Sequence, residues 1–161
     1  MSTFDQIVSI VEDKCSHAPP TVDKTAVPQA LTVAKEDVVA VCMILRENPL
    51  LYFDMLSCIT GIDNGPESGT MEVVYNLYSI PFDLHLMVKV VIPREDPRVD
   101  SVTAIWKTAN WHEREIFDLY GIHFDGHPDL RRILLPADWQ GYPLRKDYLH
   151  QEYYRDIKVK Y

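Results

Sequence analysis

The sequence predicts an α+β fold of two layers, in which helices cover one face of a mixed or antiparallel sheet and an extended C-terminal arm follows. Apolar residues recur at helical spacing near both ends of the body, whereas they alternate with polar residues through its middle. The alternating segments are joined by connections too short for a crossover helix, so neighbouring strands must be antiparallel. With 161 residues, we expect one compact body, residues 1–126, and a partner-binding arm, residues 127–161.

The first helix should begin at Thr3, which can cap it. Apolar residues then recur on one helical face through residues 4–11, and Pro19 and Pro20 stop the pattern. Residues 21–29 are typical of a loop, after which residues 31–33 predict a brief strand.

A second helix is expected after this strand. Its acidic start at residues 35–37 suits the positive end of a helix dipole. The apolar residues of the segment 38–45 would form its buried face, and Cys42 among them is expected to fill the core rather than act as a nucleophile. The helix should end at Asn48, because a residue before proline disfavours the helical conformation.

Three strands are expected in the middle of the chain. The first, residues 51–62, is apolar and β-branched and stops at a turn sequence, residues 63–66. The other two, residues 71–78 and 84–92, alternate apolar and polar positions. His85 lies on the polar face of the last strand and is interpreted as a solvated residue.

Two further helices are expected after a charged loop at residues 93–100. Apolar spacing predicts the third over residues 102–109. A fourth begins at Asn110, which forms the pattern of a capping box with Glu113, and ends at Gly121, which supplies a left-handed stop.

After this point periodicity disappears. Glycines and prolines exclude a long element, yet the segment holds many aromatic and basic residues, which are enriched at interface centres. We therefore predict an arm that lies on a partner; the alternative is a tail folded back on its own sheet.

Charge is unevenly distributed. The chain has 24 acidic and 16 basic residues, a net charge of -8, which makes nucleic acid an unfavourable partner. Residues 1–100 carry 7 bases against 15 acids, whereas residues 130–161 carry 7 bases against 4 acids. This asymmetry indicates a surface for another molecule, although ordinary solubility is the alternative.

The cysteines and the apolar runs limit the class of protein. Three cysteines without C-x-x-C spacing predict neither a disulfide framework nor a cluster or zinc site, so a reducing compartment fits best. The longest apolar run, residues 38–45, is far shorter than the roughly 20 residues that span a bilayer. We expect a soluble or peripheral protein.

Residues 111–129 contain three histidines and five carboxylates, which raises the hypothesis of a metal-dependent hydrolase. The possible ligands are His112, Glu113, Glu115, His123, Asp125 and His127. Metalloprotease-type sites place two histidines four residues apart on one helix, but here Gly126 separates His123 from His127 and Pro128 follows. The spacing therefore argues against a metal site.

An ion-pair network is the other interpretation of this region. Arg114 and Asp118 are four residues apart on one helix face. Glu115 and Asp118 are like-charged neighbours, for which Arg131 and Arg132 are the expected cations. Such groups hold geometry more than they add net stability, because desolvation offsets most of their attraction. The network suits a rigid docking surface; a solvent-exposed charged helix is the alternative.

Two long motifs resemble the C subunit of the proton-pumping NADH:quinone oxidoreductase, respiratory complex I. The first is E-R-E-I-F-D-L-Y-G-I-H-F-D-G-H-P-D-L-R-R-I-L at residues 113–134, and the second is P-L-R-K-D-Y at residues 143–148. A looser resemblance extends through residues 51–63 and 101–111, so about two thirds of the chain is covered. One departure is Lys107, where the family commonly has a proline after the tryptophan.

The resemblance implies a structural subunit with no catalytic residues, cofactor or metal of its own. FMN and iron–sulfur clusters would belong to partner subunits, and this chain would pack beside the quinone-site subunit and the iron–sulfur subunits. This subunit would be peripheral, on the cytoplasmic side of the bacterial inner membrane, and associated with the membrane through the complex only. The implied interface residues are Glu113, Arg114, Glu115, Asp118, Gly121, His127, Arg131, Arg132, Arg145, Lys146 and Asp147.

Alternatives to this assignment remain open. Related subunits occur in membrane-bound hydrogenases and in ferredoxin-linked quinone reductases, and a stand-alone metal-dependent hydrolase is a further hypothesis.

Overall fold

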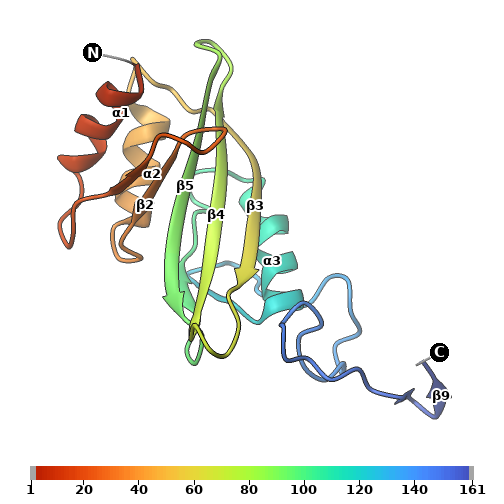
Figure 1. Ribbon diagram of the computed structural model, residues 1–161. Helices are drawn as coiled ribbons and strands as arrows, with labels where there is room; N and C mark the ends of the chain where they lie inside the picture. The colour runs from red at the N-terminus through yellow and green to blue at the C-terminus, as the bar shows by residue number, and fades with distance from the viewer. Residues whose placement is uncertain (1–2, 160–161) are drawn as a thin grey trace.

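A mixed five-stranded sheet forms the centre of the protein (Figure 1). The computed structural model describes residues 3–159. The strand order is β1-β2-β5-β4-β3, in which β2 is parallel to β5 and the other neighbours are antiparallel. The strands are Thr21–Asp23 for β1, Ala30–Val33 for β2, Met55–Asp63 for β3, Thr70–Ser79 for β4 and Leu84–Pro93 for β5.

Helices pack against one face of this sheet. They are α1 (Thr3–Glu12), α2 (Val38–Glu47) and α3 (Ala109–Tyr120). Helix α1 packs beside α2, and α3 packs on the edge strand β3 (Figure 1). Buried side chains from all three helices join one hydrophobic core with side chains of β2 to β5. The predicted two-layer α+β class is therefore confirmed, with a mixed sheet.

The strand register explains which side chains build the core. Tyr75 at the centre of β4 lies opposite Val88 on β5 and Ile59 on β3, and all three are buried. The intervening positions face away from the helices. His85 lies there, exposed and stacked on the ring of Tyr78 with 4.4 Å between ring centroids. The alternation predicted for these strands is confirmed.

The expectation of a loop over residues 21–29 is wrong for its first three residues. They form β1, which is antiparallel to β2, with Val22 opposite Leu31. Three residues are too few to show an alternating pattern. The segment is a strand because its backbone pairs with β2. Strand β3 begins at Met55 rather than at residue 51, because the N–H of Phe53 binds the carbonyl of Leu45 at the end of α2, at 3.0 Å.

The third helix expected over residues 102–109 does not form. A single helical turn appears at its start instead, in which the N–H of Trp106 donates to the carbonyl of Val102 at 3.1 Å, and a separate turn follows at residues 107–108. Tertiary contacts determine the remaining backbone. The Trp106 indole donates to the carbonyl of Phe53 at 3.1 Å, and the N–H of Val102 donates to the carboxylate of Glu113 at 2.8 Å.

Two short strands on either side of this turn were not expected. Strand β6 (Arg98–Asp100) lies in the segment interpreted as a loop, and β7 (His123–Asp125) follows α3. They pair in parallel, with buried Val99 opposite buried Phe124. This pair ties the start of the turn segment to the end of α3.

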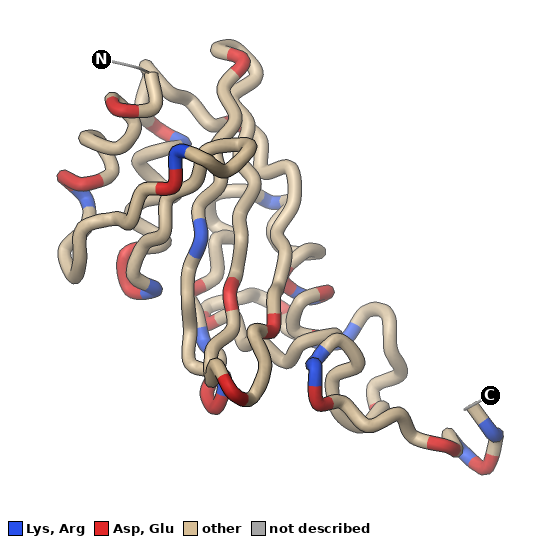
Figure 2. The backbone as a smooth tube through the Cα atoms, in the orientation of Figure 1, with Lys and Arg blue, Asp and Glu red and all other residues tan. Residues whose placement is uncertain are grey.

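Beyond β7 the chain forms an arm that leaves the sheet (Figure 1). Its last described part is a short hairpin of β8 (Tyr153–Tyr154) and β9 (Ile157–Lys158). Basic residues recur along the arm, both where it passes the sheet and near its end (Figure 2). Within residues 3–159, no helix is long and apolar enough to cross a bilayer.

Candidate functional site: the junction of helix α3 and the C-terminal arm

Asp118 on α3 holds the start of the arm. Its buried carboxylate accepts hydrogen bonds from the backbone N–H groups of Ile133, Leu134 and Leu135, at 3.1, 2.7 and 2.9 Å. Arg132 completes the site with an ion pair at 2.8 Å. Burial alone would raise the pKa of Asp118, but these donors outweigh it and lower that pKa. The charged carboxylate therefore fixes the arm against α3.

Tyr142 and two arginines continue this contact at the end of α3. Arg132 and Arg145 lie 5.2 and 5.0 Å from the centroid of the Tyr142 ring. Arg145 also donates to the carbonyl of Tyr120 at 2.7 Å, in the last turn of the helix. Gly121 ends α3 in the left-handed conformation, with φ 73°, and a Cβ there would lie 2.5 Å from the Tyr142 ring. The predicted left-handed stop is confirmed, and glycine also makes room for the arm.

A second buried carboxylate, Asp63 at the end of β3, holds the arm further along. Arg94 binds both of its oxygens, at 2.8 and 3.0 Å, and the backbone N–H of Lys146 donates to it at 2.8 Å. Arg94 also pairs with Asp147. The hydrogen-bonded Arg94 guanidinium holds the pKa of Asp63 well below its usual range. The arm is therefore fastened to the body here and at Asp118.

Of the ion pairs expected around α3, one forms within residues 3–159. Arg132 pairs with Asp118, as expected. Arg131 instead pairs with Asp129 at 2.9 Å. Glu115 is exposed and has no ionic or hydrogen-bonding partner within residues 3–159.

Arg114 and His127 reinforce the same junction through backbone carbonyls. Arg114 is buried, and its Nε donates to the carbonyl of Arg131 at 3.1 Å. The Nδ1 atom of His127 accepts from the N–H of Asp129 at 2.9 Å. Its Nε2 atom therefore carries the proton and donates to the carbonyl of Asn110 at 3.1 Å. Both side chains link α3 to the first residues of the arm.

Glu113 does not take part in a capping box. Helix α3 begins at Ala109, so Asn110 already lies inside it. Glu113 is fully buried and accepts hydrogen bonds from the Ser101 hydroxyl at 2.6 Å and the N–H of Val102 at 2.8 Å. Burial raises the pKa of Glu113 to about 7, although both hydrogen bonds act in the opposite direction. Glu113 therefore connects α3 to the segment after β6.

We expect Glu113→Gln to change the pH dependence of stability. The folded carboxyl keeps its proton up to a pKa of about 7, whereas the unfolded one releases it near 4.5. The wild-type free energy of unfolding should therefore fall as pH rises through this window, by up to about 3 kcal/mol from this group. Glutamine cannot ionise, so the variant should gain stability relative to wild type with rising pH. Urea unfolding at the two ends of the window measures this.

Glu115→Gln is the matched control, because it removes an exposed carboxylate two residues along the same helix. Its stability difference from wild type should stay constant with pH. A constant difference for Glu113→Gln as well would contradict the assignment.

The residues expected at an interface differ in how far they reach solvent. Glu113, Arg114 and Asp118 are buried, and their polar atoms are used inside the chain. Four others are exposed at the surface of the junction: Glu115, Arg131, Lys146 and Asp147. The remaining four, Gly121, His127, Arg132 and Arg145, are half-buried.

The histidines of the dense region are not brought together. His123 and Asp125 are 3.2 Å apart on β7, but Arg98 pairs with the same Asp125 carboxylate at 2.5 Å. His127 is engaged with Asn110 instead. Among residues 3–159, no three histidine, cysteine or carboxylate side chains gather to hold a metal ion.

Sequence reasoning missed Asp63, Arg94 and Tyr142. Asp63 is 31 residues from Arg94 and 83 from Lys146, so no local spacing relates them. Asp63 follows an apolar strand and was interpreted only as part of a turn. Tyr142 was one aromatic residue among several in the arm, and only its place against Gly121 distinguishes it.

Comparisons with known proteins identify the family. The family described as "Respiratory-chain NADH dehydrogenase, 30 Kd subunit" matches residues 31–154, which include both attachment points of the arm. The chain belongs to this family. The predicted resemblance to the C subunit of complex I is thereby confirmed.

Two members of this family illustrate the similarity. The C subunit of NADH-quinone oxidoreductase from Chloroherpeton thalassium is 47% identical over 154 residues, which is 94% of this chain but 63% of the relative. The protein of the same name from Geobacter sulfurreducens is 47% identical over 119 residues, 73% of this chain and 72% of the relative. This chain thus spans under two thirds of the first relative.

Two solved structures share the fold. A trypsin-resistant fragment, residues 1–134, of Nqo5 has a TM-score of 0.61 and 28% identity, covering 79% of this chain and 98% of the fragment. A chain of the membrane-bound sulfane sulfur reductase, an archaeal respiratory membrane complex, has a TM-score of 0.73 and 26% identity, covering 91% of this chain and 86% of that one.

Proposed function

We propose that this protein is a non-catalytic structural subunit of an NADH:quinone oxidoreductase. Electrons would pass from NADH through FMN and iron–sulfur clusters, all held by partner subunits, to quinone, coupled to proton translocation. Family membership and the 47% identity to C subunits of NADH-quinone oxidoreductases support the complex. The arm supports the structural role: it is fastened at two buried carboxylates and displays its remaining charges outward.

The expected partners are the quinone-site subunit and the iron–sulfur subunits. The exposed residues of the junction carry both signs of charge: Glu115 and Asp147 are negative, and Arg131 and Lys146 are positive. Mixed charges on a rigid surface favour specificity for a partner with the complementary pattern. The subunit would be peripheral, on the cytoplasmic side of the bacterial inner membrane, and attached through its partners.

A role without catalysis agrees with how this chain uses its ionisable groups. Three buried carboxylates lie at the junction, and their oxygens accept hydrogen bonds from groups of this chain; they belong to Glu113, Asp118 and Asp63. A general acid or base must instead reach a substrate proton. These groups hold segments of the chain in position.

A second candidate is the equivalent subunit of another membrane-bound complex, such as a hydrogenase or a ferredoxin-linked reductase. The structural similarity to an archaeal respiratory complex raises this candidate. The 47% identity to the NADH-quinone oxidoreductase relatives, against 26% to the archaeal chain, favours the NADH-linked complex.

Purification from the native membrane through a tag on this chain tests the proposal. We expect the quinone-site and iron–sulfur subunits to co-purify and the preparation to reduce quinone with NADH. Recovery of the chain alone, or with hydrogenase subunits, would reject the proposed complex.

Arg131→Glu should lower the recovery of partner subunits while the isolated chain keeps its fold. Arg131 is exposed, and its pair with Asp129 lies in solvent, where such pairs contribute little to stability. Reversing its charge places a repulsive group on the proposed interface, for which about a tenfold loss of recovered partners is expected. Lys14→Glu, an exposed charge reversal after α1, is the control. Equal recovery for both variants would remove Arg131 from the interface.

A further inference from the structure

Strand β3 leaves one long edge of the sheet open. It is the last strand of the sheet, and its ladder is made with β4 alone. Apart from this ladder with β4, no backbone N–H or carbonyl of β3 forms a hydrogen bond with the backbone of another segment within residues 3–159. A bulge lies between Leu56 and Cys58, after which residues 58–63 run in regular register. An edge of this length is normally covered, because it can pair with any extended chain.

The opposite edge of the sheet, formed by β1, has features that disfavour pairing with another chain. There β1 has only three residues, and Pro20, which has no N–H to donate, precedes it. Strand β3 has nine residues and holds no lysine, arginine, glutamate or proline. Its single charge, Asp63, is buried against Arg94. Beyond the bulge, residues 58–63 of β3 therefore lack the proline, the basic side chains and the short strand length that prevent pairing.

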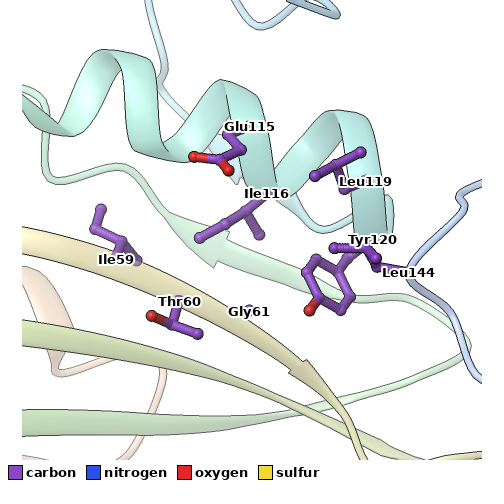
Figure 3. A pocket seen from close by; sticks show the side chains of 8 residues that line it. All are labelled: Ile59, Thr60, Gly61, Glu115, Ile116, Leu119, Tyr120 and Leu144. Carbon is purple, nitrogen blue, oxygen red and sulfur yellow. The ribbon is translucent and has the colours of Figure 1, made fainter. Parts of the chain in front are cut away.

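A groove runs beside this edge, between β3 and α3 (Figure 3). Its volume is about 160 Å³, enough for a medium-sized apolar side chain. Gly61 lets the Tyr120 ring pack directly on the strand, since a Cβ there would lie 2.9 Å from that ring. The groove is lined by Ile59, Thr60, Gly61, Ile116, Leu119 and Tyr120, together with Glu115 and Leu144.

The two ends of the groove differ in character. Glu115 lies at the α3 side of one end, exposed and unpaired within the described residues 3–159 (Figure 3). Leu144 of the arm closes the other end, and its N–H donates to the carbonyl of Leu119 at 3.0 Å. The groove is therefore continuous with the arm and carries one free negative charge.

We propose that an extended segment of another subunit of the same complex adds to the sheet along β3. Its backbone would pair with residues 58–63, an apolar side chain would enter the groove, and a lysine or arginine nearby would meet Glu115. Backbone pairing supplies affinity in this mode, while the side-chain pocket supplies specificity. The inference depends on the proposed function only in taking the partner from that complex.

A second copy of this chain fits the edge less well. Each copy carries a net charge of -8, and β3 offers no basic side chain to the Glu115 of a partner copy. Charge complementarity therefore favours a different chain, one with a basic residue beside its apolar anchor.

Photo-crosslinking in the complete complex tests this proposal. A benzophenone-bearing amino acid replaces exposed Thr60 on β3 in the full chain, which is then purified with its partners after irradiation. We expect one crosslinked partner, with the modified peptide in an extended segment that contains an apolar residue and a lysine or arginine. The same probe at exposed Thr21 on β1 should give at least tenfold less of this product.

Charge reversal supplies the second measurement. Glu115→Lys should reduce the Thr60 crosslink about tenfold, as expected when one interfacial charge pair becomes repulsive. Glu12→Lys at the exposed end of α1 is the control. A crosslink between two copies of this chain, or no crosslink in a complex that contains all its subunits, would overturn the inference. The latter result would leave the proposed function standing, whereas loss of the partner subunits from wild-type chain would reject the function itself.

Discussion

Asp118→Ala should destabilise the fold by about 3–5 kcal/mol and release the arm from helix α3. The substitution removes the carboxylate that pairs with the half-buried Arg132 guanidinium, which keeps only backbone carbonyls as acceptors, and leaves three consecutive backbone N–H groups without their acceptor. Removing one partner of a buried pair has this cost because the other charge stays desolvated. Urea unfolding measures the loss of stability.

Limited trypsin digestion reports the release of the arm separately. In the wild type, the bond after Arg132 lies in the segment that Asp118 holds, so cleavage there should be slow. The variant should be cut there much faster under native conditions. Glu115→Ala, which removes an exposed carboxylate from the same helix, should match the wild type in both measurements. Equal digestion of wild type and Asp118→Ala would show that Asp118 does not hold the arm.

Gly121→Ala should destabilise the fold by about 2–3 kcal/mol. Two causes act together. An alanine at φ 73° adopts a left-handed conformation that disfavours a Cβ, which costs about 1–2 kcal/mol. The new Cβ would also lie 2.5 Å from the Tyr142 ring, so that ring and the two arginines on it must move.

Three further variants separate these causes: Gly69→Ala, Tyr142→Ala, and Gly121→Ala combined with Tyr142→Ala. Gly69 has a similar φ of 64° with nothing within 4 Å of its Cβ position, so Gly69→Ala carries the backbone cost alone. Adding Tyr142→Ala to Gly121→Ala removes the clash, and the double variant should be less destabilised than the sum of its single changes. Thermal or urea unfolding measures the stability of these four variants against the wild type. Additive effects would show that the ring does not press on Gly121.

Long elements could be predicted from the sequence because their patterns are local. The alternation of β4 and β5 and the helical spacing of α2 each repeat over about ten residues, so the period identifies the element. Strands of three residues, such as β1 and β6, repeat no pattern. They are strands only because another strand lies beside them.

At residues 102–106 the sequence pattern instead predicted a helix that does not form. Its apolar spacing suits a helix, but Glu113 takes the N–H of Val102 and Phe53 takes the indole proton of Trp106. Tertiary hydrogen bonds here outweigh a helical preference worth less than about 1 kcal/mol per residue.

By itself the sequence determined the α+β class, the left-handed stop at Gly121 and the family, through two long motifs. The tertiary structure decided which groups the charged residues meet. Asp118 could be assigned to Arg132 from proximity in sequence, but Asp63 meets Arg94 and Lys146 across 31 and 83 residues. A buried carboxylate must take the donors that surround it in space, and chain folding, rather than sequence spacing, sets which donors these are.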